Sequence, residues 1–140
     1  MKILVAVDGS EHSDRAVAHL LGLLAAGCRA EVHLLNVRIP IESGEVRLFI
    51  KPEELEAYYR EEGQAELASA RRLLDQAGQA HTDHIAVGHL AQTIARYARE
   101  KDFDLVIMGT HGRGALQHLL LGSVASQVIK DATVPVTLVK

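Results

Sequence analysis

Five short apolar runs, rich in β-branched residues, are spaced along the chain. They extend from Lys2 to Val7, Val32 to Val37, His84 to Val87, Leu105 to Met108 and Val134 to Val139. Runs of this length and composition are typical of buried strands. Because they are apolar almost throughout instead of alternating with polar residues, they favour a parallel sheet that is covered on both faces.

Between these runs, apolar residues recur at helical spacing. The pattern predicts helices over residues 11–26, 52–76, 91–100 and from Gly122 or Ser123 to Lys130. Ser10 is suited to cap the first helix, and Pro52 and Gly78 are suited to begin and end the second. Strands and helices therefore alternate from end to end, which predicts one α/β domain over residues 1–140 with a doubly wound parallel sheet. Residues 38–51, with Pro40 and Gly44, interrupt the alternation and predict a surface loop.

Composition restricts the class of protein. The 140 residues carry a net charge of -3, so they offer no general attraction to nucleic acid or to anionic membranes. No apolar run approaches the ~20 residues that span a bilayer, and Asp8 ends the first run too early for a signal peptide. The single cysteine, Cys28, cannot form an internal disulfide and is expected to be a small, partly buried residue. We therefore expect a cytoplasmic protein.

Ligands of an open parallel sheet bind at the carboxyl ends of the strands, where the winding direction reverses. A strand order of 2-1-3-4-5 or a relative of it places the first strand there. The segments to inspect are then Asp8-Gly9-Ser10 and the stretch after Met108, in which Gly109, Gly112 and Gly114 precede a Gly122-Ser123 helix start. Glycines permit positive φ and close backbone approach, and a helix start offers unpaired amides. This segment predicts a cradle for phosphates.

Better-known phosphate and metal motifs do not fit. There is no Gly-Lys followed by Ser or Thr, as a P-loop requires, and Gln117 occupies the third glycine position of a dinucleotide fingerprint. His81 and His84 are three apart in a strand, so they point to opposite faces, and no cysteine or carboxylate set completes a zinc site. His111 and His118 flank the glycine segment without an obvious carboxylate beside them in the sequence.

The glycine segment resembles the ATP-binding signature of universal stress proteins: Gly109-x-x-Gly112, nine residues, then Gly122-Ser123. The opening from Ile3 to Ser10, the stretch from Leu120 to Ala125, and Val134-Pro135-Val136 resemble the same family in the same order. The resemblance covers the whole chain. It implies a Rossmann-like sheet of the adenine nucleotide alpha-hydrolase type, of order 3-2-1-4-5, with ATP lying across strands one and four.

The resemblance also implies roles for individual residues. Phosphates and ribose would be held by Gly109, Gly112, Gly122, Ser123 and Val124. Val37 would present its backbone to adenine, and the nucleoside pocket would be lined by Ala6, Val7, Asp8 and Met108. Asp8 is equally suited to cap the first helix, and Arg113 is either a solvated loop charge or a phosphate partner. Mg²⁺ is expected to accompany ATP, but no residue stands out as its ligand.

Three functions remain open on this basis. The chain is an ATP-binding regulator, a slow ATP hydrolase, or a dimeric interaction module in which nucleotide is incidental. Rapid turnover is disfavoured, because no base or metal site is convincingly arranged. We also expect a homodimer through the apolar edge strand from Val134 to Val139, whose backbone groups would otherwise be unpaired. The alternative is a monomer whose edge is covered by another part of the chain.

Overall fold

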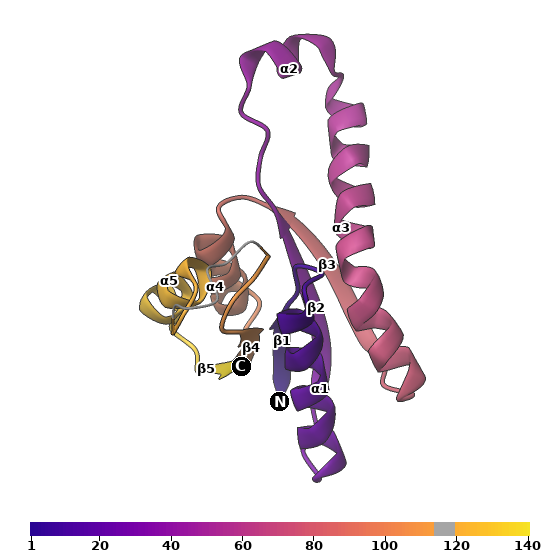
Figure 1. The fold of residues 1–140 in the computed structure, drawn as a ribbon, viewed down its shortest axis with the longest axis vertical. Helices are drawn as coiled ribbons and strands as arrows, with labels where there is room; N and C mark the ends of the chain where they lie inside the picture. Colours follow the sequence, from indigo (N-terminus) through magenta and orange to yellow (C-terminus); the bar gives the residue numbers. More distant parts are fainter. Residues whose placement is uncertain (114–119) are drawn as a thin grey trace.

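The computed structural model describes residues 1–113 and 120–140 and contains a five-stranded parallel sheet of order β3-β2-β1-β4-β5 (Figure 1). The strands are β1 (Lys2–Ala6), β2 (Glu31–Arg38), β3 (His81–Val87), β4 (Leu105–Gly109) and β5 (Val136–Val139). The helices are α1 (Glu11–Ala25), α2 (Gly44–Phe49), α3 (Pro52–Gln76), α4 (Leu90–Glu100) and α5 (Ser123–Asp131).

Helices cover both faces of the sheet, and the strand residues alternate between the two cores. On one face, α1 and α3 bury Leu20 and Leu67 against Ile3 and Val5. On the other face, α4 and α5 bury Ile94 and other apolar residues against the remaining strand residues, among them Leu4 and Val106. Ile3, Leu4 and Val5 are fully buried because β1 lies at the centre of the sheet. The strands are therefore apolar almost throughout because helices bury both faces of the sheet, as the sequence predicted.

The strand order confirms 3-2-1-4-5, and 2-1-3-4-5 is wrong. After β3, the chain crosses back through α4 and places β4 on the free side of β1, where Val5 pairs with Ile107. The winding direction reverses between β1 and β4, with α1 and α3 on one face and α4 and α5 on the other. The switch point thus lies beside β1, as expected from the sequence.

Three parts of the chain differ from the sequence prediction by more than one residue. The stretch 38–51 is not a plain loop, because β2 includes Arg38 and Gly44–Phe49 forms the short helix α2. Strand β3 begins at His81, since the polar residues at its start pair with β2, His81 with Val32. Strand β5 begins only at Val136, although the backbone oxygen of Pro135 still accepts a hydrogen bond from the N–H of Val106 at 3.0 Å.

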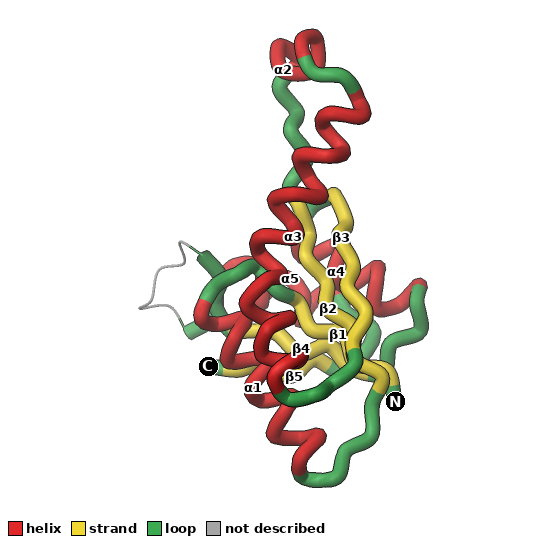
Figure 2. The backbone as a smooth tube through the Cα atoms, turned by 90° about the vertical axis from the view of Figure 1, so that its right-hand side faces the viewer, coloured by secondary structure: helices red, strands yellow, loops and turns green. Residues whose placement is uncertain are grey.

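Helix α2 and the first turns of α3 form an arm that projects beyond the sheet (Figures 1 and 2). A hydrogen bond of 2.7 Å from the N–H of Ile41 to the hydroxyl of Tyr59 joins the segment before α2 to helix α3. Leu48 and Phe49, the last two residues of α2, are 82% and 86% exposed. Among the residues that the structure describes, no helix combines the length and apolar character that crossing a membrane requires.

Candidate functional site

A cavity of about 440 Å³ opens at the carboxyl ends of the central strands. Its lining contains every site residue expected from the sequence: Ala6, Val7, Asp8, Val37, Met108, Gly109, Gly112, Arg113, Gly122, Ser123 and Val124. The structure thus brings together four segments, residues 6–8, 37, 108–113 and 122–124, at the point where the winding reverses. It adds lining residues that sequence reasoning missed: Ser13, Leu35, Arg38, Ile39, Glu66, Leu90, Ile94, Thr110, His111 and Ala125.

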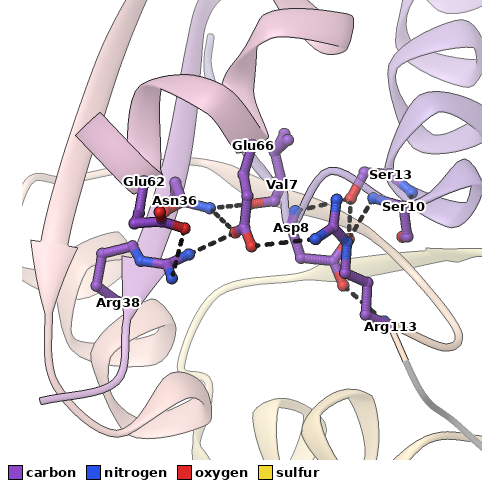
Figure 3. Close-up of polar contacts among 9 residues, drawn as sticks. All are labelled: Val7, Asp8, Ser10, Ser13, Asn36, Arg38, Glu62, Glu66 and Arg113. Carbon is purple, nitrogen blue, oxygen red and sulfur yellow. Dashed lines mark hydrogen bonds and ion pairs between the residues drawn. The ribbon is translucent and has the colours of Figure 1, made fainter. Parts of the chain in front are cut away.

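Asp8 ties the two loops of the cavity together (Figure 3). Its Oδ1 accepts hydrogen bonds from the N–H of Ser10 at 3.0 Å and the hydroxyl of Ser13 at 2.7 Å, and its Oδ2 accepts from the N–H of Arg113 at 3.1 Å. Burial acts to raise the pKa of Asp8, but these hydrogen bonds stabilise the carboxylate and the net pKa is lowered. Ser10, not Asp8, caps α1, because its hydroxyl accepts from the N–H of Ser13. Asp8 holds the turn before that cap.

The glycines of the segment serve close packing, and the expected positive φ is wrong for those that the structure describes. Positive φ occurs at Gly9, Gly27 and Gly78, whereas Gly122 has a φ of -71°. A Cβ on Gly112 would lie 2.5 Å from Oδ2 of Asp8, and one on Gly109 would lie 2.7 Å from Cβ of His12. A Cβ on Gly122 would lie 3.2 Å from the carbonyl oxygen of Thr110. Gly114 and His118 lie outside the described residues.

The start of α5 points backbone donors at the cavity. Gly122 is the N-cap residue, and no side chain caps the helix there. The N–H of Gly122 donates to the carbonyl of Thr110 at 2.7 Å, so this donor is already used. Helix geometry leaves the next three N–H groups without intrahelical partners. They belong to Ser123, Val124 and Ala125, which all line the cavity, so the site offers a positive helix end to an anion.

The backbone N–H and C=O of Val37 point to the β1 side of β2, beyond the end of β1. In a strand, the N–H and C=O of one residue point to the same side, and the side alternates with each residue. The carbonyl of Leu35 accepts from the N–H of Val7 on the β1 side, and the carbonyl of Arg38 accepts from Gly88 on the β3 side, both at 2.9 Å. Val37 therefore presents its N–H and C=O on the β1 side, beyond the last β1–β2 pair of Ala6 with Leu35.

A polar chain joins α3 to the cavity (Figure 3). The amide of Asn36, which is buried, donates to the carbonyl of Val7 at 2.8 Å and to Oε2 of Glu66 at 2.7 Å. Arg38 pairs with the same carboxylate at 2.7 Å. The Arg113 side chain is 64% exposed but not simply solvated, because its Nη1 lies 3.7 Å from Oε1 of Glu66.

Glu66 is the most informative residue that the sequence did not reveal. It stands in a helix with many other glutamates, so nothing in its local pattern separates it from solvent-facing charges. Asn36 was the available signal, because a polar residue within the apolar run of β2 requires a hydrogen-bonding partner when it is buried.

The histidines of β3 lie outside the cavity lining and on different faces of the sheet, as predicted. His81 contacts Asp75 of α3 and Asp83, at 2.9 and 2.7 Å. His84 contacts His33 at 2.8 Å and the hydroxyl of Tyr97 of α4 at 2.6 Å. In the part of the chain that the structure describes, no three His, Cys, Asp or Glu side chains gather as metal ligands.

In the cavity wall, Nδ1 of His111 lies 3.0 Å from the hydroxyl oxygen of Thr110, and the His111 ring lies 5.6 Å from that of His12. Cys28 is partly buried against the core, as expected.

Comparison with known proteins connects this geometry to one family. The model of the Universal stress protein family matches residues 1–140. Universal stress protein MJ0531 of Methanocaldococcus jannaschii is 34% identical over 99% of this chain and 81% of its own length.

Solved structures agree in fold. Hypothetical protein MJ0577, from the same organism, superposes with a TM-score of 0.83 at 34% identity, covering 99% of this chain and 94% of its own. A universal stress protein in complex with cAMP superposes with a TM-score of 0.70 at 25% identity, covering 100% of this chain and 97% of its own.

Proposed function

The chain belongs to the universal stress protein family, and on that premise we propose that its cavity binds ATP and that the bound state regulates a protein partner in a stress response. The single observation that carries the proposal is the convergence of the β1–α1 turn, the end of β2, the glycine segment and the start of α5 on one cavity. The complex of a related protein with cAMP supports an adenine nucleotide as the class of ligand.

The phosphates would lie between the glycine segment and the start of α5. The N–H groups of Ser123, Val124 and Ala125, which have no partner within the helix, suit phosphate oxygens, and the helix dipole favours negative charge there. Gly112 and Gly122 allow the close packing that shapes this space, since a Cβ on Gly112 would meet Asp8 and one on Gly122 would meet Thr110. Arg113 adds a guanidinium at the rim of the cavity.

Adenine would lie against the end of β2. The backbone N–H and C=O of Val37 match the ring nitrogen and the amino group of adenine, and Leu35, Ile94 and Met108 supply apolar walls. A volume of about 440 Å³ falls within the range of small-molecule sites.

Mg²⁺ would enter with the phosphates instead of being held by a ready-made protein site. Both oxygens of Asp8 already accept hydrogen bonds from Ser10, Ser13 and Arg113. A cation that binds through ATP keeps several waters and needs few protein ligands.

Regulation fits this site better than rapid hydrolysis. The hydrogen bonds that lower the pKa of Asp8 make its carboxylate a weak base towards water. The network of Asp8, Glu66 and Arg113 links the cavity to α3 and so to the exposed arm. The affinity of a partner that binds the arm or the loops would then depend on whether nucleotide is bound.

We also propose a cytoplasmic homodimer formed through β5. The carbonyl of Pro135 accepts a hydrogen bond from Val106 of β4, and that of Val139 accepts one from Thr110 just after β4. The alternating backbone of Val136 and Leu138 therefore points away from the sheet. Two such edges can pair about a twofold axis. The single Cys28 suits a reducing compartment.

The direct test is to denature the purified protein and to identify any released nucleotide by chromatography and mass spectrometry. We expect an adenine nucleotide close to one per chain. Gly122→Val should release none, because its side chain would crowd Thr110 and His111 and displace the backbone that would hold the phosphates, whereas exposed Gly22→Ala should release as much as wild type. Circular dichroism establishes that both variants fold. Protein that contains no nucleotide and takes up no ATP on dialysis would contradict the proposal.

A further inference from the structure

Glu66 is a negative charge in the wall of a cavity that is otherwise prepared for an anion. Its side chain is only 17% exposed, and it stands on α3, outside the loops that resemble a nucleotide signature. We infer that Glu66 determines how many phosphates the site prefers, because its carboxylate competes with the outermost phosphate for Arg113. This inference rests on the proposed function.

The Glu66 carboxylate is fixed from one side only. Its Oε2 accepts from Nη1 of Arg38 and from Nδ2 of Asn36, each at 2.7 Å. Both partners stand on β2, the Asn36 side chain is buried and the Arg38 side chain is 19% exposed, so this oxygen is held firmly. The other oxygen, Oε1, faces Arg113 with a separation of 3.7 Å from Nη1. Glu66 therefore keeps its position whether or not Arg113 stays beside it.

Arg113, in contrast, is fixed through its backbone N–H, whereas its guanidinium is largely exposed. Its N–H donates to Oδ2 of Asp8, which fixes the start of the side chain at the cavity rim. The guanidinium lies over Gly9, where a Cβ would come within 2.9 Å of Nη2 and 3.3 Å of Cα of Glu66. The absence of a side chain at Gly9 lets Arg113 reach Glu66. A pair at 3.7 Å with an exposed guanidinium is readily exchanged for a doubly charged phosphate.

Glu66 and Arg113 should affect the affinity for ATP more than the affinity for AMP. The first phosphate of a nucleotide would lie near the start of α5, whereas only a longer chain of phosphates extends to Arg113 and Glu66. There, the outermost phosphate must displace the Glu66 carboxylate from Arg113, and giving up a partly exposed ion pair corresponds to about a fivefold loss of affinity. Glu66 thus weakens triphosphate binding more than monophosphate binding. It therefore lowers the ratio of ATP affinity to AMP affinity.

Calorimetry of AMP, ADP and ATP with the full chain, with and without Mg²⁺, tests this inference. Glu66→Gln keeps a hydrogen-bonding side chain of the same length and removes the charge. We expect it to raise the ratio of ATP to AMP affinity about fivefold, because Arg113 is released to the outermost phosphate, with AMP affinity nearly unchanged. Glu62→Gln is the matched control, since Glu62 stands one turn earlier on α3 and lies 4.0 Å from Arg38. It should leave the ratio as in wild type.

A second pair of variants tests the route through Arg113. In an Arg113→Gln background, adding Glu66→Gln should change the ATP to AMP ratio less than it does in wild type. An equal change in both backgrounds, or a ratio that stays constant or falls in Glu66→Gln, overturns the inference. If wild type binds none of the three nucleotides, the proposed function fails and the inference fails with it; if it binds all three and the ratio is unmoved, only the inference fails. If Glu66→Gln does not fold, Arg113→Gln alone decides, because it must weaken ATP more than AMP.

Discussion

The backbone N–H of Arg113 donates a hydrogen bond of 3.1 Å to the side chain of Asp8, although 105 positions separate the two residues. The bond joins the turn after β1 to the glycine segment after β4 (Figure 3). Gly112 makes the approach possible, because a Cβ there would lie 2.5 Å from the same Asp8 oxygen. The shape of the cavity therefore depends on a contact between two loops as well as on the loops themselves.

Asp8→Ala should destabilise the protein by about 2–3 kcal/mol, since it removes the acceptor of three hydrogen bonds to a carboxylate. Urea denaturation at pH 7 measures the change in free energy of unfolding. Because the pKa of Asp8 is lowered in the folded protein, its contribution is present above the unfolded pKa near 3.8 and is lost as the pH falls through the folded pKa. Asp8→Asn should therefore lose less stability than wild type on acidification below about pH 4. An Asp8→Ala variant as stable as wild type would show that the bonds do not hold the loops.

Two glycines in helices should respond to alanine with opposite signs. A Cβ on Gly63 of α3 would lie 2.8 Å from Cδ1 of Ile85 on β3, so Gly63→Ala should push the helix from the sheet and lower the free energy of unfolding by about 1–2 kcal/mol. Gly22 of α1 is exposed and has nothing within 4 Å of a Cβ. Gly22→Ala should stabilise by about 0.5–1 kcal/mol through helix propensity. Thermal unfolding of both variants checks this, and a stabilised Gly63→Ala would contradict the packing described.

The two histidines of β3 should give stability opposite dependences on pH. Burial lowers the pKa of His84, and the charge of His33 lowers it further. The unfolded chain then binds the proton more tightly, so the folded state loses stability as the pH falls below about 6.5. Burial also acts to lower the pKa of His81, but hydrogen bonds to Asp75 and Asp83 raise it overall. His81 therefore contributes stability below pH 6.5 that is lost as the pH rises through its folded pKa.

His84→Gln should therefore reduce the loss of stability between pH 7 and pH 5, and His81→Gln should increase it. Denaturant unfolding across that range compares the two variants with wild type. Equal pH profiles for the two variants would be incompatible with the contacts of these histidines.

The sequence predicted most of the fold because its apolar runs and helical stripes are strong local signals. It also predicted cavity-lining residues that lie in contiguous segments, from Ala6 to Asp8, from Met108 to Arg113 and from Gly122 to Val124. It could not predict contacts between distant side chains, such as those of Glu66, whose partners come from β2 and from Arg113. The sequence also could not show why Gly112 and Gly122 are glycines. Their neighbours Asp8 and Thr110, which leave little room for a Cβ, come close only in the folded chain.

Substitution at the sheet edge tests the proposed dimer. Val136→Pro removes an N–H that points away from β4, so it should leave the fold intact and shift the protein from dimer to monomer in light scattering. Thr137→Pro is the contrasting variant, since its N–H points towards β4 and its loss should lower the melting temperature. Wild-type protein that is already monomeric at high concentration would contradict the dimer.

The central claim, an adenine nucleotide site at the ends of β1 and β4, is tested most directly by titrating nucleotide-free protein with ATP and with GTP in a calorimeter. Adenine presents an amino donor and a ring acceptor to the backbone of Val37, whereas guanine presents an acceptor and a donor in the same places, which leaves buried polar groups unpaired. We predict binding of one ATP per chain, with GTP at least about tenfold weaker. Equal affinities for ATP and GTP, or no heat of binding with ATP, would contradict the account.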